Sequence, residues 1–510
     1  MHHPQHHAQS TPDKPACILA DTGEQLSYAQ LDAASNQLAR YFYHCGLRPG
    51  DPIAFQMENS LRFIEIAWAA QRCGLVFTPL HSHLLAAEVA YILENSGAKL
   101  FICSPRYVSI ARQLDRSCLP VIHWCISEGD AAGFESLDAG MAAQPDTPLP
   151  AQTAGAAMLY SSGTTGQPKG IKPELPEVAF DEVPPVMQGI AAFLGIDAQS
   201  VYLTPAPLYH AAPMHSVMAA MALGGTVVIM DGFDPERSLA AIERYRVTCS
   251  QWVPIMFVRL LKLPEAVRNA YDLGSLKVAT HAAAPCPTSV KREMIAWWGP
   301  IINEYYAASE GIGMTAINSA QWLSHPGSVG MPLMGAVHIV DEQGRELPQG
   351  ETGMIYFSGF GDFQYHNEPE KTAGAHHPNG WATVGDMGYV DDEGFLYLAD
   401  RKDFMIISGG VNIYPQEIES LLIAHPEVAD VAVFGLPDEE FGQRVVAVVQ
   451  PANSDVDEAA FGERLNAWCH QRMSPVKCPK AYYVEAQLPR KDNGKMYKKP
   501  LQEKYQRRYA

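Results

Sequence analysis

A segment rich in glycine and hydroxyl groups, YSSGTTGQPKG at 160–170, is the part of the sequence best suited to chemistry. It holds three glycines and four serine or threonine hydroxyls, and it follows a mostly apolar stretch at 154–159. Backbone amides left open by glycine can curl around an anion, and Lys169 adds a positive charge. The pattern is not a Walker A loop, because the fifth residue after Gly163 is Pro168 rather than glycine. We therefore predict a phosphate-binding loop made of Ser161, Ser162, Gly163, Thr164, Thr165, Gly166 and Lys169.

Further segments follow this loop in order along the chain. They are YAASE at 306–310, GWATVGD at 380–386, DRKD at 400–403 with SGGVNIYP at 408–415, and LPR at 488–490 with GK at 494–495. Together with the loop they resemble the motifs of the adenylate-forming superfamily, which includes acyl-CoA synthetases, nonribosomal-peptide adenylation domains and beetle luciferases. The resemblance extends over nearly the whole chain and is closest to the acyl-CoA synthetases. It implies an enzyme that uses ATP to activate a carboxylic acid as an acyl-adenylate and then forms a thioester with coenzyme A.

Four charged residues in these segments fit the reaction that the resemblance implies. Glu310 offers the hard oxygen that Mg²⁺ prefers, and the matching family residue holds Mg²⁺ on the phosphates. Asp386 resembles the aspartate that accepts the ribose hydroxyls, and Arg401 resembles the arginine that contacts the same sugar. Lys495 resembles the lysine that reaches the α-phosphate and carboxylate oxygens during adenylation. The implied catalytic residues are Lys495, Glu310 and Lys169, with Glu310 as the metal ligand.

The resemblance also implies a site for the adenine base. Ala283, Ala284 and Pro285 align with the family's Gly-Ala-Pro segment, which packs on adenine, and Tyr306 is expected to stack on the other side of the ring. The chain departs from the family here, because alanines stand where two glycines are usual. Ser309 replaces the usual threonine and keeps the hydroxyl for phosphate contact.

The acyl pocket is expected from similarity to the family and is mostly apolar or aromatic. Its predicted residues are Tyr209, His210, Trp252, Met256, His281, Ala307, Gly311 and Met314. This set contains no lysine or arginine to pair with a second carboxylate, and 209–215 lacks the aspartate that would hold an α-amine. A hydrophobic monocarboxylate is therefore favoured, whether fatty, aryl or cyclic. His210 either gates this pocket or simply packs into its wall.

The second half-reaction is assigned by resemblance to three residues. Gly409 and Gly410 resemble the glycine turn that lines the pantetheine tunnel, where side chains would block a narrow thiol arm. Asp403 is expected to be the hinge about which the small domain rotates, exchanging the Lys495 face for the glycine face.

Two functions other than that of a CoA ligase are compatible with these motifs. An acyl-adenylate ligase that loads a carrier protein is the alternative enzyme, although no carrier domain follows Ala510. A catalytically dead binding protein on the same fold is disfavoured because Lys169, Glu310, Asp386 and Lys495 are all present.

The elements that must position these residues suggest an α/β fold. Strand-length apolar runs such as 100–103 alternate with amphipathic stretches such as 61–70, which favours helix-flanked sheets. From 336 onward, short strands and glycine turns at 341–344 and 391–394 predict a β-rich subdomain. We predict a large N-terminal domain at 1–402 and a smaller, mobile α+β domain at 403–510. The expected elements of the second domain are helices at 416–424 and 458–470 and strands at 428–434 and 445–449.

The composition of the chain argues against several classes of partner and location. A net charge of −19 on 510 residues argues against broad binding of nucleic acid or anionic membranes, since both need a basic face. The ten cysteines form no C-x-x-C pair and are expected to be free thiols. The apolar run at 217–230 is 14 residues long, too short to span a bilayer, so a cytoplasmic protein is expected. A homodimer is left open, and the histidines of the N-terminus are expected in a frayed polar end.

Overall fold

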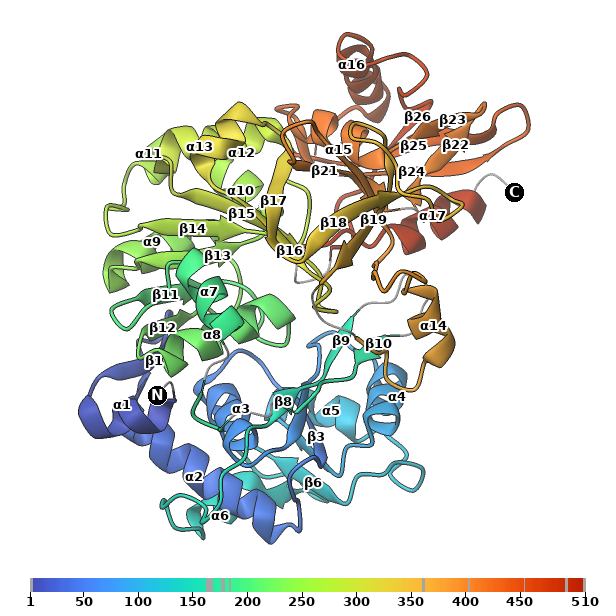
Figure 1. The fold of residues 1–510 in the computed structure, drawn as a ribbon. Helices are drawn as coiled ribbons and strands as arrows, with labels where there is room; N and C mark the ends of the chain where they lie inside the picture. The colour runs from blue at the N-terminus through green and yellow to red at the C-terminus, as the bar shows by residue number, and fades with distance from the viewer. Residues whose placement is uncertain are drawn as a thin grey trace. The chain divides into compact units, whose positions relative to one another are not determined.

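The computed structural model describes residues 3–161, 168–175, 179–182, 185–359, 363–401, 404–453, 455–490 and 494–507. The chain forms two compact units. Unit 1 consists of Met1–Gln251, Pro264–Ala279 and Phe363–Ala373, and unit 2 of Trp252–Leu263, Thr280–Asp362 and Gly374–Ala510. Both units combine sheets with helices, which confirms the predicted α/β class (Figure 1). The predicted boundary near residue 402 falls outside the described residues and stays a prediction.

Unit 1 contains a parallel sheet whose strands are neighbours in the order β7, β6, β5, β3, β4 and β8. Strand β5 (Leu100–Cys103) is buried along its whole length, as expected of a strand in a covered parallel sheet. This confirms the strand predicted at 100–103, and helix α3 (Leu61–Arg72) confirms the helix predicted at 61–70. The other strands are β3 (Pro52–Gln56), β4 (Val76–Pro79), β6 (His123–Ile126), β7 (Glu135–Ser136) and β8 (Ala156–Ala157). The accompanying helices are α2 (Tyr28–His44), α4 (Ala86–Ser96), η1 (Pro105–Tyr107), α5 (Val108–Ala111) and α6 (Leu137–Ala142).

A second set of strands in unit 1 has the order β2, β1, β12, β11 and β13. All neighbours pair in parallel except β2, which joins β1 antiparallel. The apolar run at 217–230 is divided between helix α8 (Ala211–Ala222) and strand β12 (Thr226–Ile229). Among the described residues, no helix is long and apolar enough to cross a membrane. The remaining elements are β1 (Pro15–Leu19), β2 (Gln25–Ser27), α7 (Pro185–Phe193), β11 (Val201–Thr204), α9 (Pro235–Tyr245), β13 (Cys249–Trp252), α11 (Glu265–Arg268) and α14 (Pro369–Gly374).

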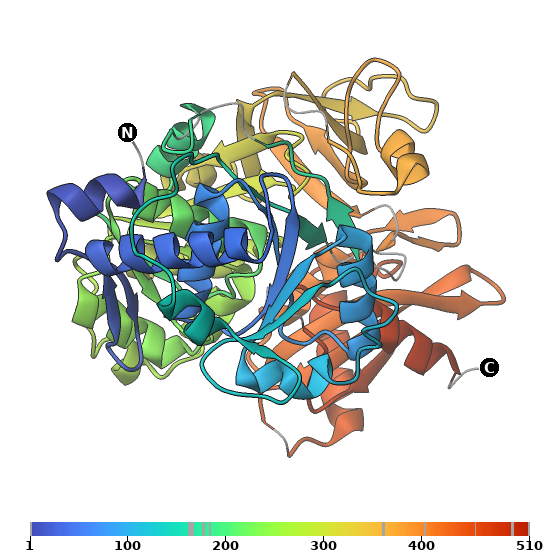
Figure 2. The same ribbon diagram turned by 90° about the horizontal axis from the view of Figure 1, so that it is seen from below.

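The histidine-rich N-terminus is folded, so the prediction of a frayed polar end is wrong. Helix α1 (Pro4–Ser10) lies beside α2 (Figures 1 and 2) and is capped by the His3 ring, which accepts a hydrogen bond from the Gln5 amide. The His3 residue is only 1% exposed and packs edge-on against Trp68 and Phe180, each at a centroid distance of 5.0 Å. Burial lowers the pKa of His3 well below its usual value. A neutral imidazole is an apolar body with a polar tip, and here it serves as part of the core.

Unit 2 contains antiparallel strands in the order β15, β16, β17, β21, β20, β19 and β18. They confirm the β-rich region predicted after residue 336. Both predicted turns are present, with the Gly344 amide 3.1 Å from the Asp341 carbonyl oxygen and the Gly394 amide 3.1 Å from that of Asp391. The strands are β15 (Ile302–Ala307), β16 (Met314–Ile317), β17 (Ser328–Met334), β18 (Ala336–Val340), β19 (Gly353–Ser358), β20 (Asp386–Val390) and β21 (Leu396–Arg401). Strand β14 (Val278–His281) and helices α10 (Pro254–Leu261), α12 (Thr288–Trp298) and α13 (Ser319–Ser324) complete this region.

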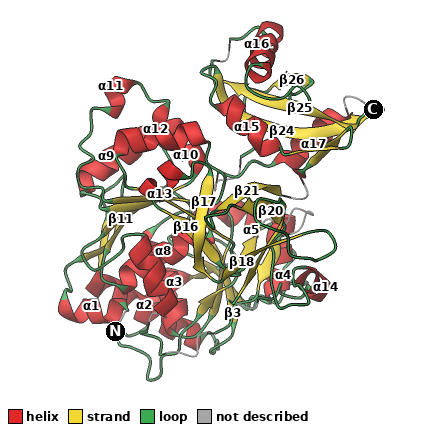
Figure 3. Ribbon diagram, turned by 45° about the horizontal axis from the view of Figure 1, so that its top comes forward, coloured by secondary structure: helices red, strands yellow, loops and turns green. Residues whose placement is uncertain are grey.

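The C-terminal part of unit 2 is an α+β arrangement of a three-stranded sheet with helices packed against it (Figure 3). Every element predicted there is present. They are α15 (Pro415–Ile423), β24 (Val428–Asp438), β25 (Gly442–Pro451) and α16 (Glu458–His470). Strand β26 (Ala481–Val484) pairs in parallel with β25, and β22 (Ile406–Ser408) and β23 (Val411–Ile413) form a hairpin. Helix α17 (Lys498–Arg507) contributes Leu501 and Tyr505 to the core of this sheet.

Candidate active site

Three of the predicted nucleotide-binding residues meet in unit 2. Tyr306 lies on β15, Asp386 begins β20, and Arg401 ends β21 directly opposite Asp386. The Tyr306 hydroxyl donates to one Asp386 carboxylate oxygen over 2.7 Å, and the Arg401 Nε donates to the other over 3.1 Å. Burial, followed by the negative charge of Asp386, holds the pKa of Tyr306 well above its usual value. The phenol therefore stays a donor, and the carboxylate is fixed in orientation while keeping lone pairs for further donors such as sugar hydroxyls.

The turn between β15 and β16 carries Ser309, Glu310 and Gly311. The Gly311 amide donates to the Ala308 carbonyl over 3.0 Å, and Gly311 has φ of 69°. Strand pairing then sets Ala307 opposite Met314, so two predicted acyl-pocket residues are cross-strand neighbours. The Glu310 side chain is partly exposed at this turn, which suits a carboxylate that must reach a metal–phosphate complex. The roles of Ser309 and Glu310 stay predictions.

The predicted adenine segment shows a backbone feature that the sequence does not reveal. Ala283 has φ of 73°, in the left-handed region that favours glycine, and it is exposed, while Ala282 before it is 5% exposed. Alanine pays a steric cost in that region because its Cβ approaches the backbone. Glycine, which is usual at this position in the family that the sequence resembles, would adopt this conformation without that cost.

Three predicted acyl-pocket residues are buried together in unit 2. Trp252, Met256 and His281 are 1%, 3% and 0% exposed. The Phe257 ring lies between two of them, with centroid distances of 6.1 Å to Trp252 and 5.5 Å to His281. These side chains form a largely apolar buried cluster, and their role in an acyl pocket stays a prediction.

Behind His281 lies a buried ion pair that sequence reasoning missed. The Lys291 ammonium pairs with the Glu304 carboxylate, and the His281 Nε2 lies 3.4 Å from the same carboxylate. Within the described part of the chain, neither His281 ring nitrogen has a hydrogen-bond partner. Burial, followed by the charge of Lys291, lowers the pKa of His281 well below its usual value, and burial raises that of Glu304. The sequence does contain an indication that Lys291 is buried, because Lys291 lies three and four residues before the apolar Met294 and Ile295, on the same face of α12.

Tyr209 and His210 belong to a ring cluster in unit 1. Their centroids are 4.7 Å apart, and His81 packs against both at 4.3 Å and 4.4 Å. The Ser82 hydroxyl lies 3.1 Å from the Tyr209 hydroxyl. His81 and Ser82 were not predicted, because the sequence gives no sign that residues so far from Tyr209 meet it.

The phosphate-loop segment is carried by a hairpin in unit 1. Strand β9 (Leu159–Ser161) pairs antiparallel with β10 (Lys169–Ile171), which sets Lys169 opposite Ser161. The Lys169 ammonium lies 4.8 Å from the centroid of the Tyr365 ring. Such a contact holds the cation without pairing it to a carboxylate. The loop residues Ser162, Gly163, Thr164, Thr165 and Gly166 lie outside the described residues, as does Asp403.

Lys495 follows a tightly held glycine in unit 2. Gly494 has φ of 77°, and a Cβ there would lie 2.8 Å from both Val253 and Ile255. Its carbonyl accepts a hydrogen bond from Arg490, whose guanidinium also pairs with the buried Asp430. The Lys495 residue itself is exposed. Gly494 is thus held in place, while the residue that follows it is exposed.

Gly409 and Gly410 form the turn of the β22–β23 hairpin. Their φ values of 57° and 80° are those of a two-residue turn in which both central residues are left-handed. The Gly409 amide donates to the Phe441 carbonyl over 2.9 Å, and a Cβ on Gly409 would lie 3.1 Å from that ring. A Cβ on Gly410 would meet open space, so the backbone conformation rather than crowding favours glycine there.

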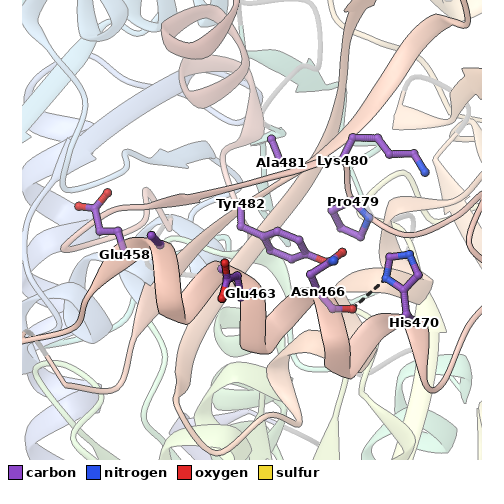
Figure 4. Close-up of a pocket in the computed structure, with 10 residues that line it drawn as sticks. Glu458, Glu463, Asn466, His470, Pro479, Lys480, Ala481 and Tyr482 are labelled. Carbon is purple, nitrogen blue, oxygen red and sulfur yellow. Dashed lines mark hydrogen bonds between the residues drawn. The ribbon is translucent and has the colours of Figure 1, made fainter.

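Unit 2 also has an open hollow of about 480 Å³ beside helix α16 (Figure 4). Its lining includes Glu458, Glu463, His470 and Lys480, with the His470 Nδ1 2.9 Å from the Asn466 carbonyl oxygen. None of its lining residues belongs to the predicted site.

Known proteins resemble this chain along its length. A family model described as AMP-binding enzyme matches residues 4–364, and one described as AMP-binding enzyme C-terminal domain matches 417–495. The long-chain-fatty-acid–CoA ligase FadD13 of Mycobacterium tuberculosis is 31% identical over 503 residues, covering 98% of this chain and 97% of that protein. A feruloyl-CoA synthase of an Amycolatopsis species is 32% identical over 494 residues, covering 96% of each. The solved structure of ATP-bound MatB from Rhodopseudomonas palustris matches with a TM-score of 0.82 and 27% identity, covering 100% of both chains.

Proposed function

The chain belongs to the AMP-binding enzyme family and is an AMP-forming acid–CoA ligase, and we propose that its acid substrate is a hydrophobic monocarboxylate. The observation that carries this proposal is the buried, largely apolar cluster of Trp252, Met256 and His281. The nearby Lys291 is paired with Glu304, so its charge is not available to a second carboxylate. The two curated relatives named above are ligases for a long-chain fatty acid and for ferulic acid, which supports a largely apolar acyl group of either kind.

The first half-reaction joins two anions. A carboxylate oxygen of the acid attacks the α-phosphorus of ATP, a new phosphorus–oxygen bond forms, and pyrophosphate leaves with the electron pair of the broken bond. Lys169 and Lys495 supply positive charge to the phosphates and to the reacting carboxylate. Mg²⁺, when bound, neutralises phosphate charge, and the partly exposed carboxylate of Glu310 is the hard ligand that would hold it.

The ribose is assigned to the Asp386 carboxylate. Tyr306 and Arg401 each donate to a different oxygen of this carboxylate, so little reorganisation is needed when a sugar hydroxyl arrives. One face of the adenine ring is assigned to Tyr306, and the other face to Ala283, Ala284 and Pro285.

In the second half-reaction the thiol of CoA attacks the acyl carbonyl, a thioester forms, and AMP leaves. The Gly409–Gly410 turn presents no side chain to a pantetheine arm. The exchange between Lys495 and this turn is assigned to a rotation at Asp403.

A screen of acids with ATP, Mg²⁺ and CoA, read out by pyrophosphate and AMP release, tests the proposal. We expect aliphatic or aromatic monocarboxylates to give both products, and the matched dicarboxylates to give neither. Efficient turnover of a dicarboxylate would contradict the assigned pocket.

The carrier-protein alternative has its own test. Preformed acyl-adenylate is offered CoA and, in parallel, a pantetheinylated carrier protein. We expect thioester on CoA, whereas transfer to the carrier alone would favour the alternative. A chain that releases no pyrophosphate with any acid would instead be a binding protein.

A further inference from the structure

Three side chains that bind metals lie together at one edge of the parallel sheet of unit 1. Cys45 follows the last residue of helix α2, while His123 and Glu135 are the first residues of the neighbouring strands β6 and β7. One ligand atom from each (a thiol sulfur, a ring nitrogen and a carboxylate oxygen) lies within 4.8 Å of the other two. None of these residues takes part in the ligase chemistry proposed above.

The contacts of the His123 ring show where a cation would sit. Its Nε2 lies 3.1 Å from the Cys45 carbonyl oxygen, which can only accept, so Nε2 carries a proton. Its Nδ1 lies 3.0 Å and 3.3 Å from the two carboxylate oxygens of Glu135, which are acceptors too. In a ring that is protonated only at Nε2, Nδ1 carries a lone pair, and two acceptors would then face each other. The contact between Nδ1 and the Glu135 carboxylate therefore requires either a second proton or a metal ion between them.

The presence of the Cys45 thiol favours a metal ion over a shared proton. A proton shared between His123 and Glu135 has no use for Cys45, whereas a metal ion at that point would have three ligands of different elements around it. Thiolate, imidazole and carboxylate are the groups that bind Zn²⁺ in proteins. A zinc-bound histidine typically donates its other ring nitrogen to a backbone carbonyl, which is the arrangement of His123 with Cys45.

The surroundings support the same assignment. The Tyr41 hydroxyl donates to Glu135 over 3.1 Å, so one carboxylate oxygen is oriented from outside the set. The Glu135 and His123 side chains are 50% and 24% exposed, which leaves the ion a way in from solvent. We propose that Cys45, His123 and Glu135 bind one Zn²⁺, with water in the fourth position, and that the ion ties the end of α2 to the sheet edge.

Cobalt titration of the full-length protein tests this proposal. A thiolate bound to Co²⁺ gives a charge-transfer absorption in the near ultraviolet, whereas the N-terminal histidines, the chief rival site, offer no thiol. We expect the band to saturate at one equivalent, to vanish when Zn²⁺ is added, and to be missing from Cys45→Ser. The matched control is Cys118→Ser, which removes an exposed thiol that contacts Asp115 and should leave the band intact.

Two further variants separate metal binding from folding. Tyr41→Phe keeps all three ligands and loses the hydroxyl that donates to Glu135 and lies 3.6 Å from the Cys125 sulfur, so its Zn²⁺ affinity should fall roughly 10- to 100-fold. His123→Asn should lose the stoichiometric site, with circular dichroism and pyrophosphate exchange showing that the chain is folded and active. If the parent protein shows no thiolate band, or if the Cys45→Ser band equals that of the parent, the proposal is wrong and the contact is a shared proton.

Discussion

At the scale of single residues, Lys495 combines an exposed side chain with a fixed backbone. The Arg490 guanidinium holds both the Gly494 carbonyl and the buried Asp430, so the lysine starts from a defined point. A preorganised cation is worth most when charge develops beside it, because it needs no reorganisation at that moment.

Replacing Lys495 with alanine should therefore slow adenylation roughly a hundred- to thousand-fold while ATP binding stays near normal. Pyrophosphate exchange and equilibrium ATP binding measure the two effects separately. Lys499→Ala, which removes another exposed lysine four residues on, is the control and should behave as the parent. Near-normal exchange by Lys495→Ala would remove this residue from the catalytic set.

The strained backbone of Ala283 leads to a prediction about the stability of the protein. Its φ of 73° carries a steric cost of about 1–2 kcal/mol for alanine, part of which is offset when glycine gives the unfolded chain more freedom. Ala283→Gly should raise the free energy of unfolding by about 0.5–1 kcal/mol in denaturant titration. Ala282→Gly removes a buried methyl group next door and should lower it. A loss of stability in Ala283→Gly would mean that the turn relaxes around the alanine.

At the scale of elements, helix α3 buries a carboxyl group whose charge opposes folding. Glu65 pairs with Arg62 over 2.6 Å on the same helix, yet burial raises the pKa of Glu65 to about 7. A carboxyl whose pKa is higher in the folded than in the unfolded state binds its proton more tightly when folded. Its contribution to stability is complete below about pH 4.3 and is lost as the pH rises through about 7.

Glu65→Gln should remove this dependence. The variant should gain stability relative to the parent between about pH 5 and about pH 8, as measured by denaturant unfolding at both pH values. Glu94→Gln alters an exposed carboxyl on α4 and should leave the pH dependence unchanged. Parallel stability curves for the parent and Glu65→Gln would show that Glu65 stays ionised throughout.

Elements with a clear apolar period were predictable from the sequence. Helix α16 has the predicted bounds, and β5 coincides with its apolar run. Strand β24 continues to Asp438, beyond the predicted end at 434, because Gly435 and Pro437 still pair with β25 in the hairpin.

Side-chain pairing across elements was the part that could not be predicted. Lys291 and Glu304 belong to none of the sequence motifs, and His3 was expected in a frayed polar end, yet all three are buried. Local patterns report which face of an element is apolar, but they do not report which polar group a distant element supplies. The motifs were recognised because each is contiguous, whereas His81 beside Tyr209 depends on the tertiary fold.

At the scale of the whole molecule, the two half-reactions should be separable at the predicted hinge. Proline at position 403 fixes φ near roughly −65° and removes an amide donor, so one of the two orientations should become inaccessible. We expect Asp403→Pro to keep nearly normal pyrophosphate exchange and to form little acyl-CoA in single-turnover assays on preformed acyl-adenylate. Asp403→Ala is the control for loss of the carboxylate alone and should keep both steps. Unimpaired CoA transfer by the proline variant would place the hinge elsewhere.

In the buried Lys291–Glu304 pair beside His281, the positive charge of Lys291 is neutralised by Glu304 and has no role in binding the proposed substrate. Glu304→Gln would leave that ammonium without its counter-ion, which typically costs about 3–5 kcal/mol in a buried site. A ligand carrying a second carboxylate could then replace the missing charge, so the variant's melting temperature should rise with an added dicarboxylic acid while the parent's does not. A single substitution would thus make the stability of the fold depend on a bound diacid that the parent does not use, so that a melting curve would report the presence of that diacid.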